Sequence, residues 1–139
     1  MLPVAVELPA EFESAGEWLA DVQAMEAAGA HALLLAPGAG DREALLGAVA
    51  AVTWRTAIVA PDASPVVELL ARGRLVRDAG ERWRRLPVPE SRAHWRQLHA
   101  EAETDGVEAV VVPLSPRLLD LLRNEDIEED RSDLQLAQG

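Results

Sequence analysis

Two short loops of the sequence carry the groups best suited to binding an anion. The first places Gly38 and Gly40 just before a predicted helix, where backbone N–H groups can surround a phosphate. The second combines the Ser115 hydroxyl and the Arg117 guanidinium at the start of another predicted helix. These four residues therefore form the predicted phosphate or oxyanion site.

Each loop also has a purely structural interpretation. The first lacks the third glycine of a Gly-x-Gly-x-x-Gly motif, and Glu43 at that position would repel an anion. An ordinary capped turn is the favoured explanation of this loop. In the second loop, Ser115 followed by Pro116 is a common way to begin a helix. The sequence leaves both interpretations open.

No catalytic residue can be assigned from the spacing of the titratable side chains. Glu7 and Asp62 follow or end predicted strands and could form a pair of carboxylates for acid–base chemistry, but no spacing rule requires it. His94 and His99 are five residues apart, not the four that place two metal ligands on one helical face, and His31 begins a strand. We therefore predict no metal site, and we expect solvated or locally hydrogen-bonded histidines.

Composition limits the chemistry and the size of the fold. The chain has 139 residues, of which 49% are hydrophobic, enough for one domain with a real core. It has no cysteine, and all 13 of its basic residues are arginine, which excludes disulfides, thiolate sites, a Schiff-base lysine and a Walker-type lysine. A complete eight-unit (β/α) barrel, which needs about 250 residues, is also excluded.

The charge of the chain indicates which kinds of partner it can bind. The net charge of −11 argues against nucleic-acid binding, and without a signal sequence or a membrane-length apolar run we expect a cytoplasmic protein with no membrane contact. The segment from Arg72 to Arg96 is nevertheless basic, with eight arginines and three acids, and Trp83 lies within it. We expect homo-oligomerisation or binding of a protein partner through this segment. Residues 124–139 form an acidic tail, which is expected to be flexible.

The hydrophobic pattern predicts alternating strands and helices. Strands are expected at 2–8, 32–36, 56–60 and 107–112, with weaker ones at 74–77 and 84–88. Helices are expected to begin after Ser14, Asp41, Ser64, Ser91 and Ser115. This order predicts a single α/β domain over residues 1–123 with a parallel sheet, either doubly wound or a piece of a barrel.

One helix-to-strand unit occurs twice, 77 residues apart. Trp18 aligns with Trp95 and Gly29 with Gly106, and a run of branched aliphatic residues follows each glycine. The repeat indicates either an internal duplication or the general form of such units.

Several segments resemble the bacterial luciferase-like flavin-dependent monooxygenases. The resemblance covers residues 3–80 and lies in the segments 29–35, 41–59 and 65–75, including the Gly73-Arg74 entry into a strand. It implies an incomplete (β/α) barrel that binds FMN or a deazaflavin, with Ser115 and Arg117 in a late loop where the family binds phosphate. The family's catalytic histidines have no counterpart at the strand ends here, and the chain has about half the family's length.

Two functions follow from these observations. The resemblance implies a flavin-binding oxidoreductase of unknown substrate, with FMN or a deazaflavin held at Gly38, Gly40, Ser115 and Arg117. The missing histidines favour a non-catalytic subunit or interaction module without a cofactor, on the same shortened fold. In that case the exposed edges of the sheet would be covered by self-association or by a partner.

Overall fold

A computed structural model describes residues 1–38 and 40–123 of the chain; the predicted acidic tail, 124–139, lies outside the described residues. The described part forms an α/β fold of six strands and five helices, as predicted. The strands are β1 (Val4–Leu8), β2 (Ala32–Leu35), β3 (Ala57–Val59), β4 (Leu75–Val76), β5 (Trp83–Arg85) and β6 (Ala109–Pro113). The helices are α1 (Ala15–Ala27), α2 (Arg42–Val52), α3 (Pro65–Ala71), α4 (Arg92–Thr104) and α5 (Pro116–Arg123).

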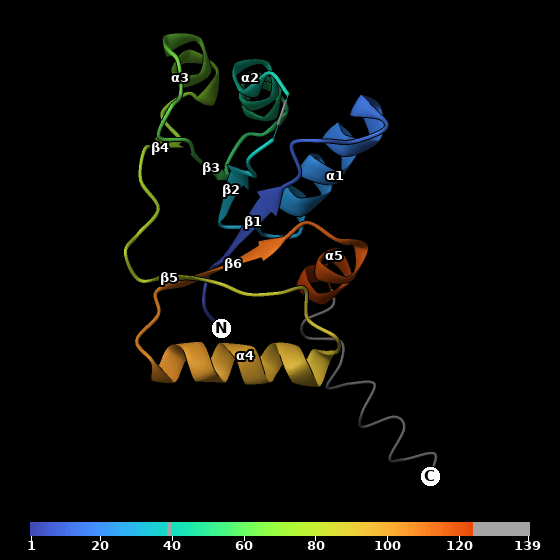
Figure 1. Cartoon of the computed structure of the whole chain (residues 1–139), viewed down its shortest axis with the longest axis vertical. Coiled ribbons are helices and arrows are strands. Elements are labelled where there is room, and N and C mark those ends of the chain that lie inside the picture. The colour runs from blue at the N-terminus through green and yellow to red at the C-terminus, as the bar shows by residue number, and fades with distance from the viewer. Residues whose placement is uncertain (39, 124–139) are drawn as a thin grey trace.

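All six strands are parallel, in the spatial order β4-β3-β2-β1-β6-β5. This is the order of strands around a (β/α) barrel with positions missing between β4 and β5. The sheet stays open, and residues 77–82 run from one edge strand to the other (Figure 1). The weak strand predicted at 84–88 is an edge strand, as expected from Pro87 and Pro89, which cannot donate backbone hydrogen bonds.

All five helices pack on one face of the sheet. For α1 to α4, which each connect two parallel strands, right-handed β-α-β connections in a barrel-like order require this. A single hydrophobic cluster joins that face to every helix. Its members include Val6, Leu33 and Val110 from the sheet, each at most 1% exposed. Trp18 and Trp95, the two ends of the 77-residue repeat, are both 3% exposed in this cluster. The sheet is therefore wound as a barrel fragment rather than as a doubly wound sandwich.

The opposite face of the sheet has a smaller core of its own. Ala5 and Ala32 lie side by side on β1 and β2 and are fully buried, with Val111 on β6 beside them. The ring of Trp83, on β5, lies 6.2 Å from that of His31, which precedes β2. Because β6 and β1 separate these strands, the Trp83 side chain reaches across the face, which is therefore concave.

The helix boundaries follow the capping residues identified in the sequence. In each of the first four helices the predicted N-cap side chain accepts a hydrogen bond from the backbone N–H three residues later. After α1 and α4, Gly29 and Gly106 adopt φ values of +97° and +77°, which glycine tolerates best. The two copies of the repeat thus end their helices in the same way.

A dense polar network holds the turn between α2 and β3, at the amino ends of the strands. The Glu26 carboxylate, on α1, accepts hydrogen bonds of 2.8–3.0 Å from the backbone N–H groups of Trp54, Arg55 and Thr56. Burial raises the pKa of Glu26, but these three N–H groups outweigh burial and lower the pKa to about 2.

Arg74 binds the same turn from its other side. Its guanidinium donates to the carbonyls of Ala50, Thr56 and Ala71 and to the hydroxyl of Thr53, at 2.8–3.0 Å. Together Glu26 and Arg74 satisfy backbone donors and acceptors that would otherwise be left without partners at the end of α2.

None of the described helices has the length and hydropathy needed to cross a membrane.

Candidate functional site

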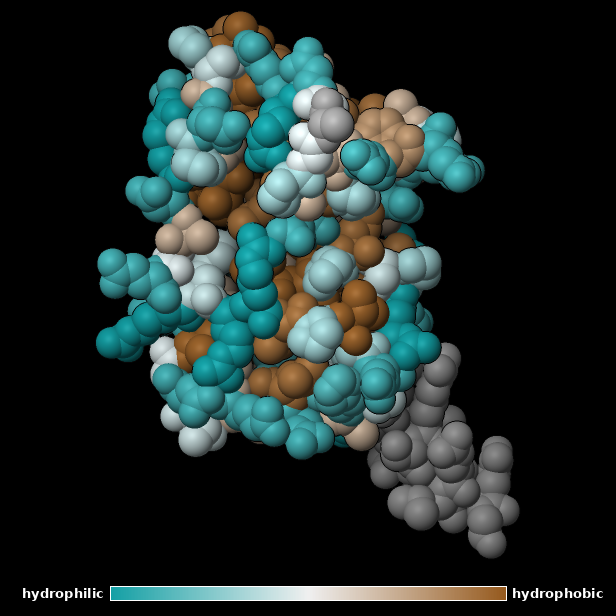
Figure 2. Space-filling model, in the orientation of Figure 1, coloured by the Kyte–Doolittle hydropathy of each residue, from teal (hydrophilic) through white to brown (hydrophobic). Residues whose placement is uncertain are grey.

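The candidate site lies at the carboxyl ends of the strands, where open parallel sheets and barrels bind their ligands. Strand β1 lies between β2 and β6, so the loops that follow these three strands are neighbours. They surround a cavity of about 180 Å³. Its lining residues are Glu7, Pro9, Ala36, Pro113 and Leu114. Figure 2 shows apolar side chains gathered over β1, β6 and α5 in the middle of the molecule.

Gly38 and Gly40 allow two of these loops to approach each other closely. A Cβ atom on Gly38 would lie 2.5 Å from the Cβ of Ala10, in the loop after β1. A Cβ on Gly40 would lie 3.3 Å from the Ala10 carbonyl oxygen. Packing against Ala10 therefore explains both glycines, and neither lines the 180 Å³ cavity. Their predicted role in binding phosphate stays a prediction.

Ser115 and Arg117 also make contacts within the chain. The Ser115 hydroxyl accepts a hydrogen bond of 3.0 Å from the Leu118 N–H, so it caps α5. The Arg117 guanidinium donates to the backbone carbonyls of Pro89 and Glu90, which ties α5 to the loop before α4. The two side chains thus contact different groups within the chain, and the anion site predicted from them stays a prediction.

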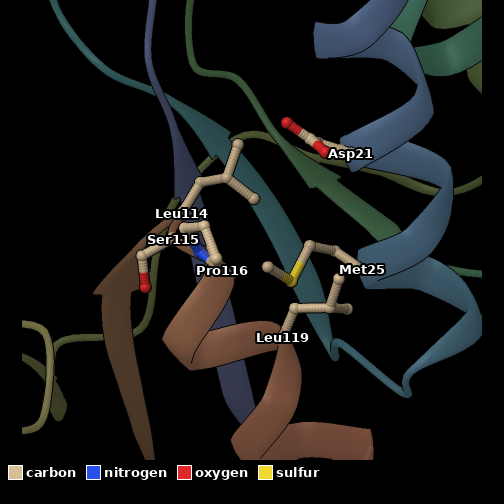
Figure 3. Close-up of a pocket in the computed structure, with 6 residues that line it drawn as sticks. All are labelled: Asp21, Met25, Leu114, Ser115, Pro116 and Leu119. Carbon is tan, nitrogen blue, oxygen red and sulfur yellow. The ribbon is translucent and has the colours of Figure 1, made fainter.

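A second cavity, of about 190 Å³, lies between α1 and α5. Figure 3 shows Met25 and Leu119 facing each other across it, with Asp21 on α1 nearby and the Ser115 hydroxyl pointing away from Met25. The remaining lining residues are Leu114 and Pro116. This mostly apolar lining can accept a small apolar group.

The two carboxylates expected at the strand ends are held by different arginines. Glu7 forms an ion pair with Arg85, which reaches it from β5. Asp62 lies 3.2 Å from Arg42, whose guanidinium also donates to the Ala36 carbonyl at 2.9 Å. The acid–base pair considered from the sequence therefore has each member neutralised by its own arginine.

The histidines differ from one another in their environments. The Nδ1 of His94 accepts a hydrogen bond of 3.0 Å from the Glu90 N–H, as expected for a locally bonded histidine. For His99 the expectation was wrong: this side chain is 2% exposed, and neither ring nitrogen has a hydrogen-bond partner. It packs edge-on against Trp95, with 4.2 Å between ring centroids. Burial, the largest cause, lowers the pKa of His99, so its neutral form is favoured.

No cluster of His, Asp and Glu suited to a metal ion occurs among residues 1–38 and 40–123.

Most arginines of the Arg72–Arg96 segment contact other groups in the same domain. Besides Arg74 and Arg85, Arg84 pairs with Asp105 at 2.8 Å, Arg92 pairs with Asp120 at 2.9 Å, and Arg77 lies 3.4 Å from Glu68. Because these contacts neutralise much of its charge, the segment fits an acidic partner less well than its composition suggests. Binding through Arg72–Arg96 stays a prediction.

The chain matches none of the protein-family models, curated proteins or solved structures with which it was compared. The luciferase-like resemblance therefore rests on the residues that suggested it, and flavin binding stays a prediction.

Proposed function

We propose that this chain is a non-catalytic interaction module built on an open ring of β/α units. One observation carries the proposal: the polar groups at the strand ends are committed to partners in the same chain. Glu7 binds Arg85, Asp62 binds Arg42, and Ser115 caps α5. A substrate or cofactor that bound the same groups would compete with these contacts.

The size of the cavities supports the same conclusion. The cavity at the carboxyl ends of the strands measures about 180 Å³ and the one between α1 and α5 about 190 Å³, whereas the hollow of about 420 Å³ beside Pro3 and His31 lies at the amino ends. Pockets for drug-sized ligands and cofactors usually measure about 300–1,000 Å³. A flavin ring system would therefore require the loops after β1, β2 and β6 to move apart, against the close packing of Gly38 on Ala10.

The open sheet also favours a role in binding another protein molecule. Strands β4 and β5 end the sheet, and each leaves one side of its backbone without a neighbouring strand. Both are short, three residues at most, which limits uncontrolled edge pairing. A module of this shape has surfaces that a complete barrel would cover with its remaining units.

A flavin-binding oxidoreductase is the second candidate. The strand order favours it, because β5-β6-β1-β2-β3-β4 is the order of a barrel from which units are missing. In this alternative, FMN or a deazaflavin would bind near Gly38, Gly40, Ser115 and Arg117. The bound flavin would supply the redox chemistry, and these residues would hold its phosphate.

Thermal unfolding in the presence of cofactor distinguishes the two functions. A ligand present at 100 times its dissociation constant stabilises the folded state by about 2.7 kcal/mol and raises the melting temperature by several degrees. We expect no increase with millimolar FMN or deazaflavin. An increase that Arg117→Ala abolishes would overturn the proposal and establish the flavin site.

A further inference from the structure

Helices α2 and α3 present an outer face that is unusually apolar for a protein of this charge. Trp54, Val66 and Leu69 are 69%, 57% and 76% exposed. We define the α2–α3 outer face by six residues: Ala44, Ala48, Ala51, Trp54, Val66 and Leu69. Figure 2 shows hydrophobic side chains at the upper edge of the molecule, over α3. An apolar face of this kind indicates a binding surface.

The spacing of these residues makes the face continuous. Ala44, Ala48 and Ala51 lie at i, i+4 and i+7 on α2, on the side opposite its buried residues Leu46 and Val49. On α3, Val66 and Leu69 are three residues apart and share one side.

The two helices also pack closely. A Cβ on Gly47 of α2 would lie 3.5 Å from Cδ1 of Leu70 on α3, an ordinary contact distance. Small alanines on one helix lie beside larger side chains on the other, and another helix pair can pack against such a surface.

Charge divides the face into two ends. Helices α2 and α3 run in the same direction, because both connect parallel strands in the same sense. At the amino end of α2 are the exposed acids Asp41 and Glu43. At the carboxyl ends, the Arg72 guanidinium lies 4.4 Å from the centre of the Trp54 ring. The face therefore has acids near one end and Arg72 at the other, with apolar side chains between them; Glu68, exposed beside Leu69 on α3, pairs with Arg77 at 3.4 Å.

We propose that the α2–α3 outer face binds the same face of a second copy of this chain, in a two-fold symmetric dimer. The two-fold axis would run through the apolar middle and place α2 and α3 of the copies antiparallel. Arg72 of each copy would then approach Asp41 and Glu43 of the other, so opposite charges would meet at both ends.

A second copy fits this pattern better than a uniformly charged partner. A contacting surface of uniform negative charge, such as a nucleic acid, would be repelled by Asp41 and Glu43, and a surface of uniform positive charge by Arg72. This inference rests on the proposed function, since it names the partner of the interaction module. The proposed dimer makes no contact with the carboxyl ends of the strands and leaves them exposed.

Sedimentation equilibrium of the full chain tests the proposal. We expect a species of twice the 15.0 kDa chain mass at micromolar concentration and physiological salt. Leu69→Asp should raise the dimer dissociation constant at least tenfold, because it would bury a carboxylate where the interface is apolar. The matched control is Val88→Asp, which places the same charge at an exposed valine outside the face and should leave the dissociation constant unchanged.

Charge reversal tests the predicted orientation. Glu43→Arg should weaken the dimer severalfold. Adding Arg72→Glu should restore part of the lost affinity, because the two reversed charges attract each other again across the two-fold axis. Since Arg72 also donates a hydrogen bond to the Thr53 carbonyl, circular dichroism should confirm that the double variant folds.

The outcomes separate this inference from the proposed function. A wild-type chain that sediments as a monomer at 100 µM, or a Leu69→Asp variant as dimeric as wild type, would overturn the two-fold dimer. Either result would leave the interaction module standing if flavin also fails to raise the melting temperature. A flavin-dependent increase would overturn the proposed function, whatever mass the chain shows.

Discussion

The two ends of the sheet are held by different kinds of polar contact. At the amino ends, Glu26 and Arg74 enclose the turn after α2 with short hydrogen bonds to backbone groups, and Glu26 is only 9% exposed. At the carboxyl ends, Glu7–Arg85 and Asp62–Arg42 are ion pairs in which at least one partner is well exposed to solvent. Buried charges that bind backbone groups contribute more to stability than exposed ion pairs do.

The difference shows where this fold is rigid. The amino-end network fixes the segment that carries Trp54 and, through the bond from Arg72 to the Thr53 carbonyl, the end of α3. It therefore holds the basic end of the α2–α3 outer face in place. The carboxyl ends, where (β/α) enzymes bind substrates, have weaker polar contacts and small cavities.

The largest expected effect comes from neutralising one carboxylate at each end. Glu26→Gln should lower the free energy of unfolding by about 3 kcal/mol, because a neutral amide accepts the three N–H bonds poorly. Glu7→Gln, the matched change at the carboxyl ends, should cost less than about 1 kcal/mol. Urea denaturation measures both. Equal losses would contradict the distinction between the two ends.

Acid should destabilise the protein through Glu26. Its pKa is about 2 in the folded state and 4.5 in the reference state, so the unfolded chain binds the proton more readily. The stability that this shift provides is fully present above pH 4.5 and is lost as the pH falls towards 2, by about 3 kcal/mol in total. Unfolding free energies measured across this range should fall less steeply in Glu26→Gln. A variant with the same slope as wild type would show that another carboxylate is responsible.

Gly38→Ala tests whether the glycine loop exists for packing. The added Cβ would lie 2.5 Å from the Cβ of Ala10, so we expect a loss of about 1–3 kcal/mol. Ala10→Gly in the same chain removes the clash, because the nearest remaining atom, the Ala10 Cα, lies 3.7 Å away. The double variant should recover most of the loss in a thermal melt. An undiminished loss would mean that Gly38 is needed for another reason.

Replacing His99 should change the free energy of unfolding least, and should raise it rather than lower it. Since both of its ring nitrogens are buried without partners, His99→Leu should stabilise the protein by about 1 kcal/mol at pH 7. Because the pKa of His99 is lowered in the folded state, the unfolded chain takes up the proton more readily as the pH falls below 6.5, and the wild-type protein loses stability there. The difference in unfolding free energy between His99→Leu and wild type should therefore grow as the pH falls. His94→Leu, which removes the acceptor of the Glu90 N–H bond, should destabilise instead. A less stable His99→Leu would point to a partner for this ring.

Local signals made most of the fold predictable. Ser14, Asp41, Ser64 and Ser91 begin helices as expected, because an N-cap acts within its own turn of chain. The continuous apolar runs at 32–35 and 109–113 are strands covered on both faces. The strand order could not be predicted, since alternating β and α units suit both a barrel fragment and a doubly wound sheet.

The site was less predictable, because its contacts join residues distant in sequence. Glu26 looks like any surface acid on α1, and no local pattern links it to a turn 28 residues later. Arg117 suggested an anion site, but it binds carbonyls of the loop before α4. The alanine spacing on α2 was a usable signal for the outer face. It became informative only once α3 was placed beside α2.

The most direct test of the central claim is a fluorescence titration of FMN, and separately of a deazaflavin, with the purified 139-residue chain. The claim is that this protein acts through its outer surface rather than through the strand ends. It predicts no saturable change in flavin fluorescence up to 100 µM protein. Saturable binding at micromolar concentration, weakened by Arg117→Ala and unaffected by Leu69→Asp, would contradict the claim and place the function at the carboxyl ends of the strands.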